Sequence, residues 1–75
     1  MKGYEIRVNW NTAGAVESLR REHGMTYQEF EDLFDVSELM LIAADNGRDT
    51  IRPSHIERMC RYFGIEPAAL RCEVV

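Results

Sequence analysis

The sequence predicts a mainly α-helical fold of four to five helices, with a short two-stranded β element formed by the two ends of the chain. Three observations support this fold class. Apolar residues recur at helical spacing through the middle of the chain, residues typical of helix starts and stops separate these stretches, and strict apolar–polar alternation is confined to the two ends. With 75 residues, the chain is expected to be one domain, residues 1–75, with a small core.

The N-terminal segment is predicted to form a half-buried strand over about residues 4–10. Its apolar face consists of Tyr4, Ile6, Val8 and Trp10. A first helix over about residues 12–23 follows, with Asn11 or Thr12 as its cap. Gly24 is expected to end this helix in a left-handed conformation.

The second helix is predicted over about residues 26–34, and it has the best start signal in the chain. Thr26 and Glu29 fit a capping box, in which the side chain of each residue bonds the backbone amide of the other. The side chains expected to be buried are Phe30, Leu33 and Phe34.

The third helix is predicted over about residues 37–46, with Ser37 as its cap and Gly47 at its end. Its expected core residues are Leu41 and Ala44. A separate apolar stripe at i, i+3, i+4 consists of Leu39, Ile42 and Ala43. This stripe is either covered by another segment, such as the N-terminal strand, or open to a partner.

The C-terminal third contains two further helices and a strand. A capping box of Ser54 and Glu57 is expected to open a fourth helix over about residues 54–63. Pro67 fits the first turn of a short fifth helix over residues 67–70, and the alternating tail predicts a strand over about residues 71–75.

The two predicted strands are expected to pair antiparallel. The register that we expect pairs Ile6 with Val74, Val8 with Cys72 and Trp10 with Leu70, and places Arg7 opposite Glu73. An isolated two-stranded ribbon is marginally stable in water, so this sheet must either pack on the helices or gain strands from a second chain. The second option would make the protein a dimer.

The charge distribution argues against a general attraction to nucleic acid. The net charge is −4, and residues 26–50 contain seven acidic residues against one base, Arg48. The half of the chain that contains the second and third helices is therefore its acidic half.

Other classes of function have little support. Cys60 and Cys72 are expected to be reduced core residues. A His55–Cys60 nucleophile pair would diverge by about 140° on one helix, and a metal site of His55, Cys60 and Cys72 lacks paired ligand spacing. We therefore expect no enzyme, metal, cofactor or small-molecule substrate. Since no segment is apolar for long enough to span a bilayer, a cytoplasmic protein without membrane contact is expected.

A set of residues at and between the predicted helices forms a recognisable pattern. It comprises Leu19-Arg20-Arg21-Glu22-His23-Gly24-Met25-Thr26, Phe30, Val36-Ser37, Leu41, Asp45-Asn46-Gly47, Pro53-Ser54, Phe63-Gly64-Ile65 and Ala69-Leu70. Through these residues the chain resembles the phage-repressor (Xre/Cro-like) helix-turn-helix family, in a short-chain branch with terminal strands. The resemblance implies a repressor-like helix-turn-helix bundle, with the second and third helices as the helix-turn-helix pair.

The resemblance also implies which residues would meet DNA. Near the start of the second helix, the family's phosphate-contacting position corresponds to Tyr27, and Gln28 beside it is a further DNA-binding candidate. A phosphate-contacting character is kept by Asn46, Arg48 and Arg52. The base-reading positions correspond to Glu38, Leu39, Met40 and Ala43. Side chains that read the major groove are typically Arg, Lys, Asn or Gln, so this set predicts weak or degenerate base readout.

Two functions from different classes follow. The first is a small transcriptional regulator that binds DNA as a homodimer. The second is a helix-turn-helix module that does not bind DNA and instead contacts protein, as an antirepressor or a dimerising accessory factor. The candidate residues for a partner interface are Leu39, Met40, Ile42 and Ala43 of the third helix, with Ile6, Val8 and Val74 of the terminal strands.

Overall fold

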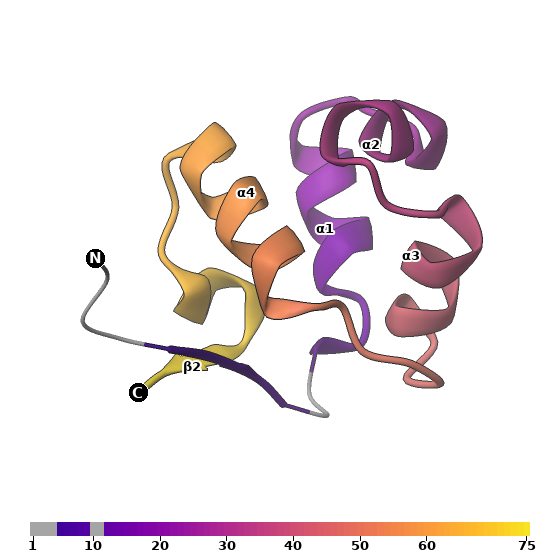
Figure 1. Cartoon of the computed structure of the whole chain (residues 1–75). Helices are drawn as coiled ribbons and strands as arrows, with labels where there is room; N and C mark the ends of the chain where they lie inside the picture. Colours follow the sequence, from indigo (N-terminus) through magenta and orange to yellow (C-terminus); the bar gives the residue numbers. More distant parts are fainter. Residues whose placement is uncertain (1–4, 10–11) are drawn as a thin grey trace.

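The structure, a computed structural model, describes residues 5–9 and 12–75 (Figure 1). Its elements are β1 (Ile6–Val8), α1 (Ala15–Glu22), α2 (Tyr27–Phe34), α3 (Glu38–Asp45), α4 (Pro53–Phe63), the 3-10 helix η2 (Pro67–Leu70) and β2 (Cys72–Val74). The described part is thus mainly helical, with four α-helices and a two-stranded antiparallel sheet, and the predicted fold class is confirmed.

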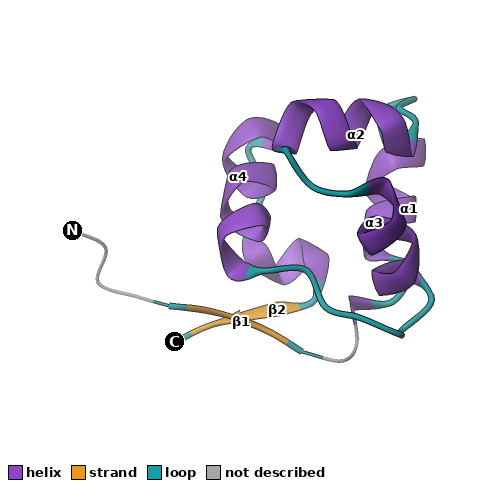
Figure 2. Cartoon of the chain, turned by 45° about the vertical axis from the view of Figure 1, so that its right-hand side comes forward, coloured by secondary structure: helices purple, strands orange, loops and turns teal. Residues whose placement is uncertain are grey.

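The helices form a compact group with the sheet at one edge. In Figures 1 and 2, α2 lies across the top, α3 and α4 lie on opposite sides, and the sheet lies below the helices on the side of α4. Strand β1 contacts α4, while α3 packs against α1 and α2. The sheet therefore packs on helices of its own chain, which is the first of the two options that the sequence left open.

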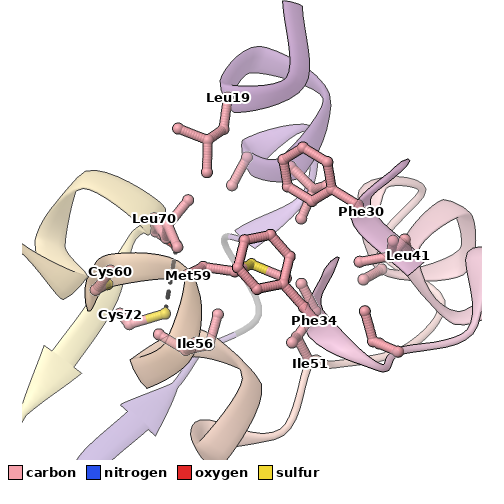
Figure 3. Close-up of a cluster of buried hydrophobic side chains, with 14 of the residues drawn as sticks. Leu19, Phe30, Phe34, Leu41, Ile51, Ile56, Met59, Cys60, Leu70 and Cys72 are labelled. Carbon is pink, nitrogen blue, oxygen red and sulfur yellow. Dashed lines mark hydrogen bonds between the residues drawn. The ribbon is translucent and has the colours of Figure 1, made fainter. Parts of the chain in front are cut away.

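One apolar core joins all the helices (Figure 3). Its largest fully buried side chains are Phe30, Leu41, Ile51, Ile56, Met59, Leu70 and Val16. Leu41 and Ala44, predicted as the inner residues of the third helix, have no exposed surface. These side chains, drawn from every helix, hold α2 and α3 against the rest of the domain.

The terminal sheet has the register that the sequence predicts. Ile6 pairs with Val74, Arg7 lies opposite Glu73, and Val8 pairs with Cys72. Tyr4 and Trp10, expected at the ends of the first strand, lie outside the described residues, and so does the Trp10–Leu70 pair. The second strand begins at Cys72 because the preceding Arg71 has a left-handed backbone with φ of 60°, which ends η2.

The first helix is shorter than predicted. It begins at Ala15 instead of residue 12, with Gly14 (φ 78°) as its N-cap and without a side-chain cap from its own segment. The predicted cap Thr12 is buried, and Asn11 lies outside the described residues. The positive φ of Gly14 turns the chain sharply into the helix, a conformation that glycine adopts without steric cost.

Two further predictions need correction in α2 and α4. Leu33, expected in the core, is 43% exposed, because Phe30 and Phe34 alone occupy the inward side of α2. The predicted Ser54–Glu57 capping box does not form. Helix α4 begins one residue earlier, at Pro53, so Ser54 lies inside the first turn and Arg52 is the N-cap.

Other helix ends agree more closely with the sequence. The Thr26–Glu29 capping box is confirmed, with both reciprocal bonds present. Ser37 is the N-cap residue of α3, although its side chain makes no capping bond. The short fifth helix is a 3-10 helix that begins at Pro67.

Candidate nucleic-acid interface

Helices α2 and α3 form a helix-turn-helix unit. The turn between them contains Asp35, whose backbone is left-handed with φ of 55°, and its amide bonds the carbonyl of Glu31 at 2.9 Å. Aspartate tolerates this conformation better than most residues other than glycine. Val36 follows and is buried in the core, so it anchors the turn against the domain.

Asp45, the last residue of α3, connects three helices. Its carbonyl accepts from the amide of Gly14 at 3.1 Å, and its Oδ1 accepts from the amide of Val16 at 3.1 Å. Its Oδ2 accepts from the hydroxyl of Tyr27 at 2.6 Å. Asp45 thereby supplies the cap that α1 lacks in its own segment, and a carboxylate at a helix N-terminus is also favoured by the helix dipole. We call this set of contacts the Asp45 clamp.

The Asp45 clamp changes the role expected for Tyr27. The hydroxyl of this half-buried residue donates to Asp45, and the guanidinium of Arg20 lies 4.7 Å from the centre of its ring. Burial, and then the bond to the Asp45 carboxylate, raise the pKa of Tyr27 to about 12. Because the hydroxyl is bonded to Asp45 inside the domain, Tyr27 orients α2 relative to α3. This geometry does not support its predicted phosphate contact.

The outer side of α3 is apolar at its first turn. Leu39 is 78% exposed, the highest value among the large apolar side chains of the described residues. Met40, by contrast, is half-buried and packs against the core, while Ile42 and Ala43 are half-buried. The apolar stripe predicted on this helix therefore faces solvent fully only at Leu39, because the other side chains turn partly toward neighbouring helices.

Four of the polar DNA candidates are exposed. Gln28 lies in the first turn of α2, Asn46 is the C-cap of α3, and Arg48 and Arg52 lie in the loop that leads to α4. Glu38, in the first turn of α3, is half-buried. The exposed acidic side chains of the helix-turn-helix unit and the loop after it are Glu29, Glu31, Asp32, Asp35 and Asp49. This part of the surface therefore has more carboxylates than guanidinium groups.

The three candidate interface residues of the strands differ in how deeply they are buried. Ile6 is buried, and Val8 is half-buried against the core, whereas Val74 is 52% exposed. Since β1 turns its apolar side toward α4 of its own chain, Ile6 is a core residue, and the expectation that it contacts a partner needs correction. Val8 packs partly against the same core and keeps some exposed surface.

The buried thiols and the histidines do not form a metal site. In the described ranges, no three His, Cys, Asp or Glu side chains are grouped so that they could hold a metal ion. Cys60 and Cys72 are free and buried (Figure 3), and burial raises the pKa of both thiols, that of Cys72 to about 11. Thiols that stay protonated are poor nucleophiles and poor ligands. No helix in the described ranges has the length and apolarity needed to cross a membrane.

Sequence reasoning missed two features of this surface. One is the Asp45 clamp, which joins residues up to 31 positions apart (Gly14 and Asp45) and leaves no local signal beyond the presence of an aspartate at a helix end. The other is the exposure of Leu33 beside Tyr62, which is 59% exposed. A pattern of apolar residues on one helix cannot show which of them the neighbouring helix covers.

Comparison with known proteins gives a likeness in fold. The chain matches no protein-family model and no curated protein. Among solved structures, it is similar to a transcriptional regulator from Listeria innocua, with a TM-score of 0.70 and 19% sequence identity over 85% of this chain. The match spans 58% of that protein, little more than half of its length. The chain therefore shares the fold of part of a transcriptional regulator.

Proposed function

We propose that this domain acts in transcription regulation as a helix-turn-helix module that binds DNA mainly through the phosphate backbone, with weak base readout. The observation that carries the proposal is the clamped pair of α2 and α3, within a fold shared with a transcriptional regulator over 85% of the chain. The proposed family is the phage-repressor (Xre/Cro-like) group that the sequence resembles.

The proposed phosphate contacts come from the exposed polar side chains around α3. Arg48 and Arg52 flank the loop after this helix, and within the described residues neither is held in an ion pair. Gln28, in the first turn of α2, supplies an amide that donates to phosphate oxygens. These contacts position the domain on a duplex and carry no sequence information.

Base readout is weak in this proposal because the outer side of α3 has few groups that match base edges. Leu39 offers an apolar contact to a thymine methyl group, and Glu38 can accept from a base amino group such as that of cytosine but cannot donate. The carboxylates of Asp35 and Glu38 also repel nearby phosphates. Affinity should therefore be low and strongly dependent on salt.

The test is duplex binding, measured by fluorescence anisotropy over a series of salt concentrations. Arg48→Ala and Arg52→Ala should each weaken binding equally for all sequences and reduce the slope of log K against log salt by about 0.9. Arg7→Ala, an exposed arginine on β1, is the matched control and should leave the slope unchanged. Absence of duplex binding by micromolar protein at low salt would contradict the proposal.

The second candidate is a protein-interaction module, and the 78% exposure of Leu39 favours it. In this role, the chain would act as an antirepressor. The first turn of α3 and the carboxylates of the helix-turn-helix unit would bind a basic, partly apolar protein. Leu39→Lys separates the candidates. The added ammonium should strengthen duplex binding if α3 faces phosphates, whereas it should place a repelling charge in the contact if α3 faces a basic protein.

We further propose that the protein acts as a homodimer. Helix-turn-helix domains commonly bind two half-sites, about one helical turn apart, as symmetric dimers. For a domain with weak base readout, two linked contacts raise the affinity without any new type of contact.

A further inference from the structure

Two shallow hollows adjoin on the face where α2 packs against α4. The first, of about 340 Å³, is lined by Met25, Glu29, Asp32, Leu33 and Tyr62. The second, of about 350 Å³, is lined by Leu33, Phe34, Arg58, Arg61 and Tyr62. Leu33 and Tyr62 line both hollows, so the two depressions meet at these side chains. We call Leu33 and Tyr62 the apolar ridge.

The apolar ridge is exposed but held in place. Leu33 is 43% exposed and Tyr62 is 59% exposed. The ring of Tyr62 meets Phe34 edge-on, with centroids 5.6 Å apart, and Phe63 at 4.9 Å. A ring held by two aromatic neighbours loses little conformational entropy when a partner covers it, so the apolar ridge is preorganised for binding.

Acidic and basic side chains lie in different hollows beside the apolar ridge. The first hollow contains the carboxylates of Glu29 and Asp32 from α2, and the second contains the guanidinium groups of Arg58 and Arg61 from α4. Arg58 is fastened to the carbonyl of Phe34 at 3.3 Å, and Arg61 pairs with Glu57 while its side chain stays 76% exposed. One apolar centre therefore has an acidic side and a basic side.

We infer that this face binds the same face of a second copy of the chain, around a twofold axis. A twofold interface brings one surface against itself, so it requires a surface that is complementary to itself. An acidic hollow and a basic hollow on either side of an apolar ridge meet that requirement, because rotation places Asp32 of each copy near Arg61 of the other. A partner of a single charge sign, such as a nucleic acid, would be repelled by one of the two hollows.

This inference specifies the homodimer proposed above, and it does not depend on DNA binding. The other surfaces are less suited to self-association. Leu39 lies in the first turn of α3, whose charged residues, Glu38 and Asp45, are both acidic, so this helix does not supply charges of both signs. The apolar side of β1 is already covered by α4.

A charge exchange tests the inference by sedimentation velocity in buffer without DNA. We expect the wild-type protein to show a concentration-dependent monomer–dimer equilibrium. Asp32→Arg and Arg61→Asp should each raise the dissociation constant of the dimer by at least about tenfold. In a dimer of either variant, both of the symmetric contacts between residues 32 and 61 join like charges. An equimolar mixture of the two variants should recover the dimer, since both contacts between the unlike copies then join opposite charges.

Variants of the apolar residues locate the contact independently of charge. Leu33→Ser should weaken the dimer, while Leu39→Ser, which alters another exposed leucine on a neighbouring helix, should leave it unchanged. Val74→Ser is the corresponding control for the terminal sheet. Far-ultraviolet circular dichroism of each variant checks that the helices are retained.

Three results would overturn the inference. The first is a wild-type protein that stays monomeric up to millimolar concentration. The second is a dimer that survives Leu33→Ser but is lost with Leu39→Ser or Val74→Ser, which would assign the contact to α3 or to the sheet. The third is a mixture of the exchange variants that shows no recovery although both are folded. Since no DNA is present, failure of the DNA-binding proposal would leave each of these measurements valid.

Discussion

Leu39 and Leu41 lie two residues apart on α3, yet one is 78% exposed and the other has no exposed surface. Neighbours at this spacing point in directions about 200° apart on a helix. The inner side of α3, with Leu41, Ala44 and Asp45, belongs to the core and to the Asp45 clamp. On the outer side, Leu39 is largely open to solvent, so this side chain contributes little to the fold and is available for contact.

The largest expected effect is at Leu41. Leu41→Ala should lower the free energy of unfolding by about 2–5 kcal/mol, because it removes packed atoms and leaves a cavity. Leu39→Ala should change the same quantity by less than about 0.5 kcal/mol. Urea denaturation followed by circular dichroism measures both. Similar losses for the two variants would mean that the two sides of α3 do not differ as described.

The next effect concerns the Asp45 clamp. Asp45→Ala should lower the free energy of unfolding by about 2 kcal/mol, because the amide of Val16 loses its cap and the hydroxyl of Tyr27 loses its acceptor. Asp49→Ala is the matched control, since Asp49 is exposed and bonds only the neighbouring amide of Thr50 among the bonds described. Equal stabilities of the two variants would show that the clamp does not hold α1, α2 and α3 together.

A smaller effect, with a distinct pH dependence, is expected for Tyr27→Phe. The variant should lose about 1 kcal/mol at neutral pH, the usual value of one hydrogen bond. The pKa of Tyr27 is raised from 10.0 to about 12, so its stabilising contribution is complete below pH 10 and is lost as the pH rises toward 12. The wild type should therefore lose stability in this alkaline range more steeply than the variant.

Unfolding curves measured between about pH 8 and about pH 11 test this expectation. Tyr62→Phe serves as the control for a change of tyrosine content at an exposed site. If the wild type and Tyr27→Phe show parallel pH profiles, the hydroxyl of Tyr27 is not bonded to Asp45 in solution.

The sequence predicted what depends on local pattern. The register of the terminal strands followed from alternation at Ile6, Val8 and Val74, and the start of α2 followed from the spacing of Thr26 and Glu29. Both features are determined by residues close in the chain or by a simple pairing rule.

What the sequence did not reveal depends on contacts between distant segments. The start of α1 is determined by Asp45, from another helix, so the residues around Thr12 give the wrong boundary. The exposure of Leu33 depends on how α4 is placed, since Phe30 and Phe34 already fill the space below α2. The DNA candidate Tyr27 was predicted from its position alone, and only the structure shows where its hydroxyl points.

The most direct test of the central claim compares wild-type binding to two unrelated duplexes over a series of salt concentrations. Because the contacts proposed for Arg48 and Arg52 are to phosphate, we expect both duplexes to bind with nearly equal affinity and with the same salt slope. Replacing both arginines by alanine should lower that slope by about 1.8, twice the contribution of one phosphate contact. No detectable binding at low salt, or an affinity for one duplex about a thousandfold higher than for the other, would contradict a DNA-binding module with weak base readout.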